Sequence, residues 1–223
     1  NLVSLNSTGT ATGTLSVTGS GTATRTVTID AITGDGTLGI SVISGSANDA
    51  VGNFAVATGP SATFTVDNTA PTLTLSPPSQ TPTRSGPVTY TVSYVGADSV
   101  TLAPADVTLN TTGTATATLS VSVVDTTTAT ITLANIVGDG TLSVDIAANT
   151  ASDALGHLAL AAGPSEAVTV DNTAPTAVIG APSATLTRGG PVSYTVTYTG
   201  ADVVTLGAAD VGLIATGTAT GSV

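Results

Sequence analysis

The sequence predicts an all-β chain of tandem β-sandwich domains, and three features of its 223 residues support this fold class. The first is a repeat: the seven residues at 66–72 return unchanged at 170–176, at a spacing of 104 residues. The second is a set of short runs in which apolar residues alternate with Thr or Ser, as in strands with one buried face. The third is that no segment of useful length shows a helical period. Because a unit of this length is an ordinary domain size, the repeat predicts an array of whole domains.

Two further phrases keep the same spacing and define the repeating unit. Residues 33–38 match 137–142, and residues 84–88 match 188–192. The chain therefore divides into three parts: 1–67, the C-terminal part of one repeat; 68–171, a complete repeat; and 172–223, the N-terminal part of another. This division fits a segment of a longer polypeptide, and it also fits a subunit whose split ends complete each other between chains.

The complete unit is expected to contain seven strands, each an alternating run bounded by turn residues. In chain order the runs are 72–76, 87–95, 99–109, 114–123, 127–134, 141–147 and 165–170. Turn signals between them include Ser85-Gly86-Pro87, Gly96-Ala97-Asp98 and Gly138-Asp139-Gly140. Seven strands in about 100 residues predict an immunoglobulin-like sandwich.

Alternation in the second and fifth runs predicts which side chains form the core. Every other residue there is apolar, with Thr or Ser in between. Residues two apart on a strand point to the same face of the sheet. The expected core residues of these two runs are Val88, Tyr90, Val92, Tyr94, Ala129, Ile131 and Leu133.

The composition excludes several classes of protein and site. Only 8% of residues are charged, and 14 Asp and Glu against 3 Lys and Arg give a net charge of -11. Nucleic-acid binding requires clustered basic residues, so cations are the more natural partners. With no Cys, the chain has no disulfide and no thiolate metal site. No run of roughly 20 apolar residues predicts a membrane span in this segment.

Three phrases of the sequence resemble the tandem bacterial Ig-like domains of very large secreted surface adhesins. They are the repeated phrase at 66–72, the run at 85–92 and the segment at 47–53, and the resemblance covers the entire chain. It implies a secreted protein, extracellular or at the cell surface, in which such repeats form a structural stalk or fibre. It also implies stiffening by calcium at the domain junctions, with neighbouring repeats as the contact partners.

Acidic and amide side chains near the repeated phrase are candidate calcium ligands. Counting strands up and down the unit places three acidic loops at the end where the chain enters, with the Asp35 loop at the facing end of the preceding unit. The three loops carry Asp98, Asp125 and Asp153. Calcium takes six to eight oxygen ligands, although Asp and Asn also favour turns for conformational reasons. The candidate ligands are Asp35, Asp67, Asn68, Asp98 and Asp153 at the first junction, and Asp139, Asp171, Asn172 and Asp202 at the second.

The sequence offers little that could catalyse a reaction. His157 is the single histidine and Glu166 the single glutamate, so no Ser–His–Asp or Cys–His arrangement is expected. His157 stands where the preceding copy has Asn53, which predicts a solvated loop side chain. We therefore expect a protein that is not an enzyme.

The leading hypothesis is a structural spacer segment of a secreted adhesin or surface fibre, and two others stay open. One is a filament subunit that polymerises when a neighbouring chain completes its split domains by strand addition. The other is a module that binds surface glycans or ice through a flat face of threonines, although Thr also has a high intrinsic β propensity. The threonines expected on that face are Thr112, Thr114, Thr116, Thr118, Thr126, Thr128, Thr130 and Thr132.

Overall fold

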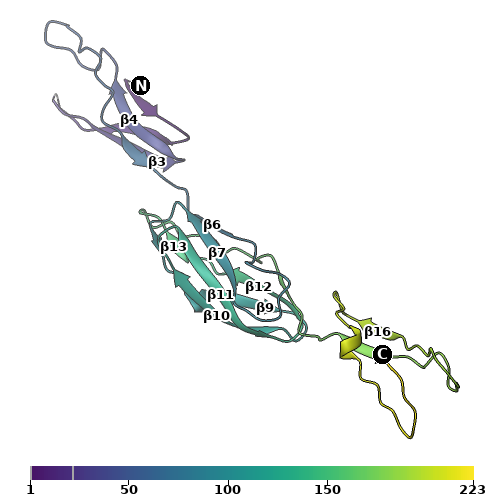
Figure 1. The fold of residues 1–223 in the computed structure, drawn as a ribbon. Coiled ribbons are helices and arrows are strands. Elements are labelled where there is room, and N and C mark those ends of the chain that lie inside the picture. Colours follow the sequence, from purple (N-terminus) through teal and green to yellow (C-terminus); the bar gives the residue numbers. More distant parts are fainter. Residues whose placement is uncertain (1, 22) are drawn as a thin grey trace. The chain divides into compact units, whose positions relative to one another are not determined.

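A computed structural model describes residues 2–21 and 23–223 of the chain (Figure 1). Its regular structure is almost entirely antiparallel β-sheet, as the sequence predicts, and is consistent with a β-sandwich. The chain forms two compact units, one ending at Val170 and the other spanning Asp171–Val223. The two helices of the described residues are single 3-10 turns, so no helix there could cross a membrane.

The central sandwich, residues 72–170, has two main sheets. The first contains four strands in the order β10 (Thr116–Val123), β11 (Thr128–Val137), β7 (Val88–Val95) and β6 (Thr72–Leu75). The second contains three strands in the order β14 (Val168–Val170), β12 (Gly140–Ile146) and β9 (Val107–Thr111). A short pair, β13 (Ala151–Ser152) with β8 (Ser99–Val100), closes one end.

The core lies between the two sheets and follows the predicted alternation. In the first sheet Tyr90 of β7 lies opposite Ile131 of β11, and both side chains are fully buried. All seven expected core residues of these strands are at most 3% exposed, which confirms the prediction of their inward face. The second sheet contributes its own buried side chains from β12 and β14: Leu142, Val144, Ile146, Val168 and Val170.

The run at 99–109 is not one strand, and the sequence contains the reason. It divides into β8, a 3-10 turn η1 (Pro104–Asp106) and β9. Pro104 has no N–H to donate to a sheet and its fixed φ suits the start of a helical turn. The Asp106 carboxylate accepts the Ala103 N–H at 2.9 Å, which holds the turn closed. The chain thereby changes direction between the two sheets.

Residues 2–66 form a smaller part of the first unit. Their first sheet has the order β1 (Val3–Ser7), β4 (Gly36–Val42) and β5 (Phe64–Val66), and a separate hairpin pairs β2 (Thr12–Thr18) with β3 (Thr26–Thr33). The buried hydrophobic side chains of this part, among the described residues, are Ala11, Leu38 and Val66. This part has fewer paired strands than the central sandwich. Its β3 pairs with β2 alone, whereas β11 pairs with both β10 and β7.

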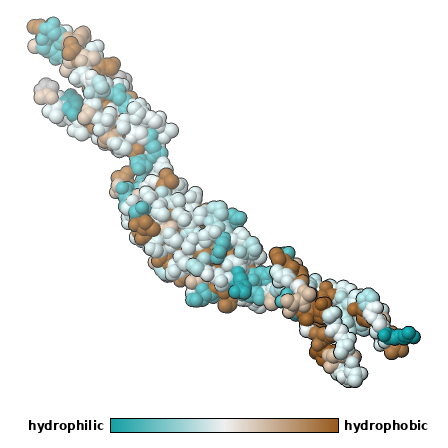
Figure 2. Space-filling view, viewed as in Figure 1, coloured by the Kyte–Doolittle hydropathy of each residue, from teal (hydrophilic) through white to brown (hydrophobic). Residues whose placement is uncertain are grey.

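The second unit has one hairpin, β15 (Thr176–Ile179) with β16 (Val196–Thr199), and a 3-10 turn η2 (Ala208–Asp210). None of the residues of Asp171–Val223, all of which are described, is buried. Figure 2 shows hydrophobic side chains gathered on the surface of this unit. The exposed large ones include Val178, Ile179, Val203, Val204, Leu213 and Ile214.

We predict that residues 68–171 fold alone as an all-β monomer, because they contain both sheets and both halves of the core. In that segment Ile131→Ala should lower the free energy of unfolding by about 2–5 kcal/mol, the cost of truncating a fully buried isoleucine. Thr91→Ala on the exposed face of neighbouring β7 is the matched control and should cost about 1 kcal/mol or less. Urea unfolding followed by circular dichroism measures both. Equal losses in the two variants, or substantial helix in the segment, would contradict the sandwich.

Candidate functional site at residues 67–69

The turn between β3 and β4 presents Asp35 at the end of the strands. Gly34 and Gly36 flank it with φ of +76° and +143°, a region that favours glycine. A Cβ atom on Gly34 would collide with the Thr10 carbonyl oxygen. The Thr10 hydroxyl in turn accepts the Asp35 N–H at 2.9 Å, so the turn is pinned to the preceding loop. The Asp35 carboxylate therefore points away from the turn, toward residues 68 and 69.

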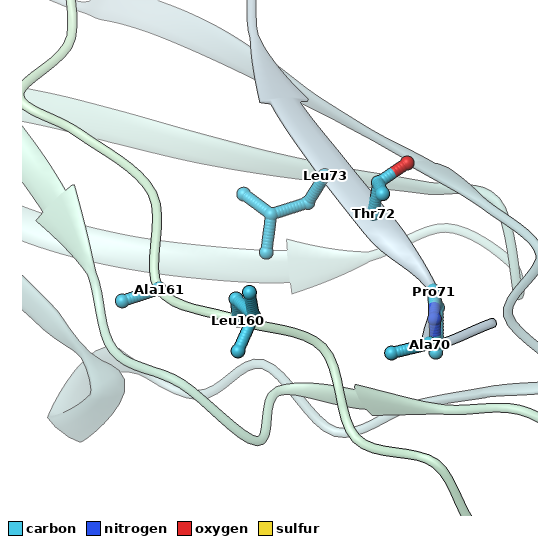
Figure 3. Close-up of a pocket in the computed structure, with 6 residues that line it drawn as sticks. All are labelled: Ala70, Pro71, Thr72, Leu73, Leu160 and Ala161. Atoms are coloured by element: carbon cyan, nitrogen blue, oxygen red, sulfur yellow. The ribbon is translucent and has the colours of Figure 1, made fainter. Parts of the chain in front are cut away.

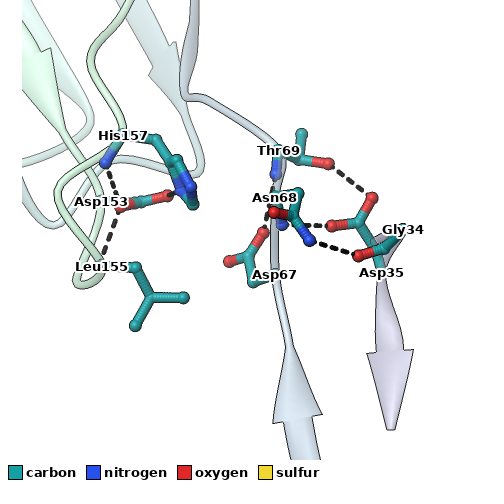
Figure 4. Close-up of polar contacts among 8 residues, drawn as sticks. All are labelled: Gly34, Asp35, Asp67, Asn68, Thr69, Asp153, Leu155 and His157. Atoms are coloured by element: carbon teal, nitrogen blue, oxygen red, sulfur yellow. Dashed lines mark hydrogen bonds and ion pairs between the residues drawn. The ribbon is translucent and has the colours of Figure 1, made fainter. Parts of the chain in front are cut away.

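This carboxylate holds the segment that leads into the central sandwich (Figure 4). Asp35 Oδ1 accepts the Asn68 N–H at 2.6 Å, and Oδ2 accepts the Thr69 hydroxyl at 2.9 Å. The Asn68 side-chain amide donates to the Gly34 carbonyl oxygen at 2.7 Å. We call these three hydrogen bonds, between Gly34–Asp35 and Asn68–Thr69, the linker latch.

The latch stabilises the ionised form of Asp35. The hydrogen bond from the Asn68 N–H lowers the pKa of the carboxyl group most, and the bond from the Thr69 hydroxyl lowers it further. Hydrogen bonds to the charged form of a carboxyl favour that form. Asp35 is therefore a carboxylate at neutral pH, and it accepts charge-assisted hydrogen bonds.

A second acidic turn lies on the other side of the linker, at Asp153. Its Oδ1 accepts the N–H groups of Leu155 and His157, both at 2.9 Å, and its Oδ2 lies 2.7 Å from His157 Nδ1 (Figure 4). Asp153 is only 8% exposed. Burial raises the pKa of this carboxyl group, but the hydrogen bonds from His157 and Leu155 together outweigh it, and the pKa is lowered.

The same turn recurs at Asp49, and the comparison explains His157. Asp49 Oδ1 accepts the N–H groups of Val51 at 3.0 Å and Asn53 at 2.9 Å, and its Oδ2 accepts the Asn53 side-chain amide at 2.8 Å. In the central sandwich the imidazole Nδ1 occupies the place of that amide nitrogen. His157 is thus paired with an aspartate and one-third exposed, instead of the freely solvated side chain that the sequence predicts.

The structure brings His157 and Asp153 together with Asp67 of the linker. One ligand atom from each of the three side chains lies within 4.8 Å of the other two. Asp67 Oδ1 also accepts the Thr69 N–H at 3.0 Å, which fixes the carboxylate beside the linker backbone. Both aspartates are among the ligands predicted from the sequence, whereas the histidine is not. The signal for it was the spacing of four residues shared by Asp49 and Asn53 with Asp153 and His157.

The other ligands expected at the first junction, Asp35, Asn68 and Asp98, have different partners, and so does Asp125 in the third acidic loop. Asp35 and Asn68 bond to each other in the latch. Asp98 follows β7 and donates its backbone N–H to the Ser152 carbonyl oxygen at 2.9 Å, beside the acidic turn. Asp125 Oδ1 accepts both the N–H and the hydroxyl of Thr127 at 2.7 Å, which closes the turn between β10 and β11.

The residues expected at the second junction fall on both sides of the boundary between the units. Asp139 lies in the turn between β11 and β12. Asp171 and Asn172 open the second unit, and Asp171 Oδ1 accepts the Thr173 N–H at 2.9 Å, as Asp67 does with Thr69. Asp202 is exposed in a bend after β16.

The outer face of the four-stranded sheet carries the expected hydroxyl groups, but in a different set. Thr112 and Thr114 are not part of this hydroxyl face. The Thr112 hydroxyl bonds to the Thr141 hydroxyl, and the Thr114 hydroxyl bonds to the backbone of Asp139. Serines of β10 take their place in the cross-strand rows. Two rows cross β10, β11 and β7: Ser122–Thr130–Thr91 and Ser120–Thr132–Thr89.

A small apolar hollow lies at the start of β6, next to the linker (Figure 3). Its volume is about 230 Å³, and Leu73 and Leu160 point toward each other across it. The other lining residues are Ala70, Pro71, Thr72 and Ala161. Its lining has one hydroxyl group and no ionisable side chain. These residues are suited to apolar packing and not to catalysis or metal binding.

No protein-family model, curated protein or solved structure matches this chain.

We predict that Asp35→Ala releases the linker without unfolding the sandwich. The Asn68 amide loses its acceptor, so its hydrogen exchange should become at least about fivefold faster, the effect of one ordinary hydrogen bond. Asp125→Ala is the matched control, because that carboxylate bonds to Thr127 within its own turn, away from the linker backbone. Unchanged exchange at Asn68 in Asp35→Ala would show that the latch does not hold the linker.

The latch should also weaken in acid. Because the pKa of Asp35 is lowered in the folded protein, the stabilisation is present above the ordinary carboxyl pKa of about 3.9 and is lost as the pH falls through the lower, folded value. The chemical shift of the Asn68 amide proton, followed by NMR, should titrate with a midpoint below that ordinary value. A midpoint at or above it would contradict a hydrogen-bonded Asp35 carboxylate.

Proposed function

We propose that the central sandwich is an immunoglobulin-like domain. The strand order of its sheets supports this assignment: with β6, β7, β9, β10, β11, β12 and β14 lettered A to G, the sheets read D-E-B-A and G-F-C. The constant type of immunoglobulin domain has strands A, B, E and D in one sheet and C, F and G in the other. The cysteines of antibody domains are absent, and tyrosines and aliphatic residues fill the core instead.

We also propose that the chain is a tandem array of this domain. The positions of the elements support a 104-residue repeat, since β1 and β9 differ by that offset at both ends, and so do β4 and β12. The same offset relates β5 to β14, β6 to β15 and η1 to η2. The seven-residue sequence repeated at 66–72 and 170–176 then lies at each junction between domains.

We infer that the array serves as a structural spacer in a secreted bacterial adhesin or surface fibre. The linker latch is the observation that carries this proposal, because it gives the junction between successive repeats a fixed hydrogen-bonded geometry. Pro71 limits the backbone directly after the latch. In this role the protein is not an enzyme, and its partners are neighbouring repeats of the same kind.

Calcium at the junction remains a prediction that the latch makes more specific. Asp35 and Asn68 stabilise the linker directly, so an ion would draw on the remaining carboxylate oxygens of Asp67, Asp98 and Asp153. Removing it would leave these negative charges unneutralised at one end of the sandwich. Calcium would therefore stabilise the junction in addition to the hydrogen bonds of the latch.

We predict that small-angle scattering of the full chain gives a smaller maximum dimension for Asp35→Ala than for the unsubstituted protein, since a loosened junction samples bent arrangements. Chelation of calcium at constant ionic strength should shorten the unsubstituted chain as well, with circular dichroism showing the β-sheet signal intact. Asp125→Ala is again the control and should leave the dimension unchanged.

Each arm of this experiment has an outcome against the proposal. An unchanged dimension after chelation would remove calcium from the junction and leave the latch, proline and packing as its constraints. An unchanged dimension in Asp35→Ala would contradict a spacer held straight by the latch.

A further inference from the structure

We propose that Asp67, Asp153 and His157 bind a transition-metal cation such as Zn²⁺, at a site that shares two carboxylates with the predicted calcium site and adds a nitrogen ligand. Zinc holds nitrogen and oxygen ligands at about 2.0–2.1 Å, which places neighbouring ligand atoms roughly 3.3 Å apart in a tetrahedral site. The three side chains already present ligand atoms within 4.8 Å of one another. Small side-chain rotations therefore suffice to bring them onto one ion.

His157 is oriented for this role by its contact with Asp153. Asp153 Oδ2 lies 2.7 Å from Nδ1, so a metal ion that replaces the proton between these two atoms binds both of them, with the remaining imidazole proton on Nε2. The pair thus provides a pre-oriented nitrogen ligand before any ion arrives.

The two aspartates have lone pairs to contribute. A carboxylate has roughly four lone-pair positions, and Asp153 uses three, for the N–H groups of Leu155 and His157 and for the imidazole. Asp67 uses one, for the Thr69 N–H. The metal takes the place of the imidazole proton on Asp153 and a free position on Asp67, and water can complete the coordination.

The nitrogen ligand determines the class of cation. Calcium and magnesium take oxygen ligands, whereas imidazole suits zinc, copper, iron and nickel. Two carboxylates and a neutral imidazole carry two negative charges, which a divalent cation neutralises. The acidic turn itself does not need an imidazole, because Asn53 makes the equivalent hydrogen bond to Asp49.

This equivalence supplies a matched substitution. His157→Asn should keep the turn closed, as Asn53 does in its own copy, while it removes the imidazole nitrogen that would bind the metal. Asp67→Asn removes the linker ligand and leaves the Asp153–His157 pair intact. Asn53→His builds the same pair at Asp49 and leaves the proposed site unaltered.

The experiment is calorimetric titration of the full chain with Zn²⁺ in the presence of excess calcium. We expect one zinc ion per chain, with amide shifts in NMR confined to 67–69 and 153–157. His157→Asn and Asp67→Asn should each weaken binding by at least about tenfold, the lower end of the loss seen even for outer-shell partners of metals. Asn53→His should bind as the unsubstituted chain does. Co²⁺ should give visible absorption bands that His157→Asn abolishes.

Three results would overturn the site: no zinc binding, equal affinity in His157→Asn, or amide shifts spread over the other acidic turns. Displacement of zinc by calcium would also count against a nitrogen-containing site. Circular dichroism and the Leu155 amide shift verify that His157→Asn retains its fold and turn. None of these outcomes bears on the spacer proposal, which is tested by the scattering of Asp35→Ala.

Discussion

The pairing of β7 with β11 is the interaction on which the rest of the sandwich depends. Its register places Tyr90 opposite Ile131 and directs both into the core. A shift of one residue would turn every apolar side chain of the pair outward. Because β6 adds to the free side of β7 and β10 to the free side of β11, the whole first sheet inherits this register. The second sheet then packs on the face that the pair has made apolar.

The three parts of the chain show how much this pairing contributes. In the proposed repeat β3 corresponds to β11, and the described part of residues 2–66 has no counterpart of β7 and few buried hydrophobic residues. In the second unit β16 lies in the position of β7 without a counterpart of β11, and no residue is buried. Both halves of the pair are present in the central sandwich alone, and the large core forms there.

The sequence predicts the strands and their inward faces well, because alternation is a local signal that each strand carries by itself. The break at Pro104 was also predictable from residue chemistry, although the alternating pattern around it concealed the 3-10 turn. The latch was not predictable in detail, since it joins Asp35 to a backbone N–H 33 residues later and depends on how two loops meet. Of the loops that the strand count brings to this end, those of Asp35 and Asp153 lie beside the linker. The position of His157 was missed because it depends on an aspartate four residues earlier and on a linker carboxylate far away in sequence.

The latch also determines how tension passes along the chain. A pull on the backbone that enters β6 divides between the covalent path through Asp67 and the three hydrogen bonds to Gly34 and Asp35. These bonds are exposed, so water can replace them at little cost, whereas the ladder between β7 and β11 lies against a buried core. The junction therefore yields first and can re-form when the pull ends. In the proposed spacer, this order of opening makes the junction an elastic coupling in front of the folded domain.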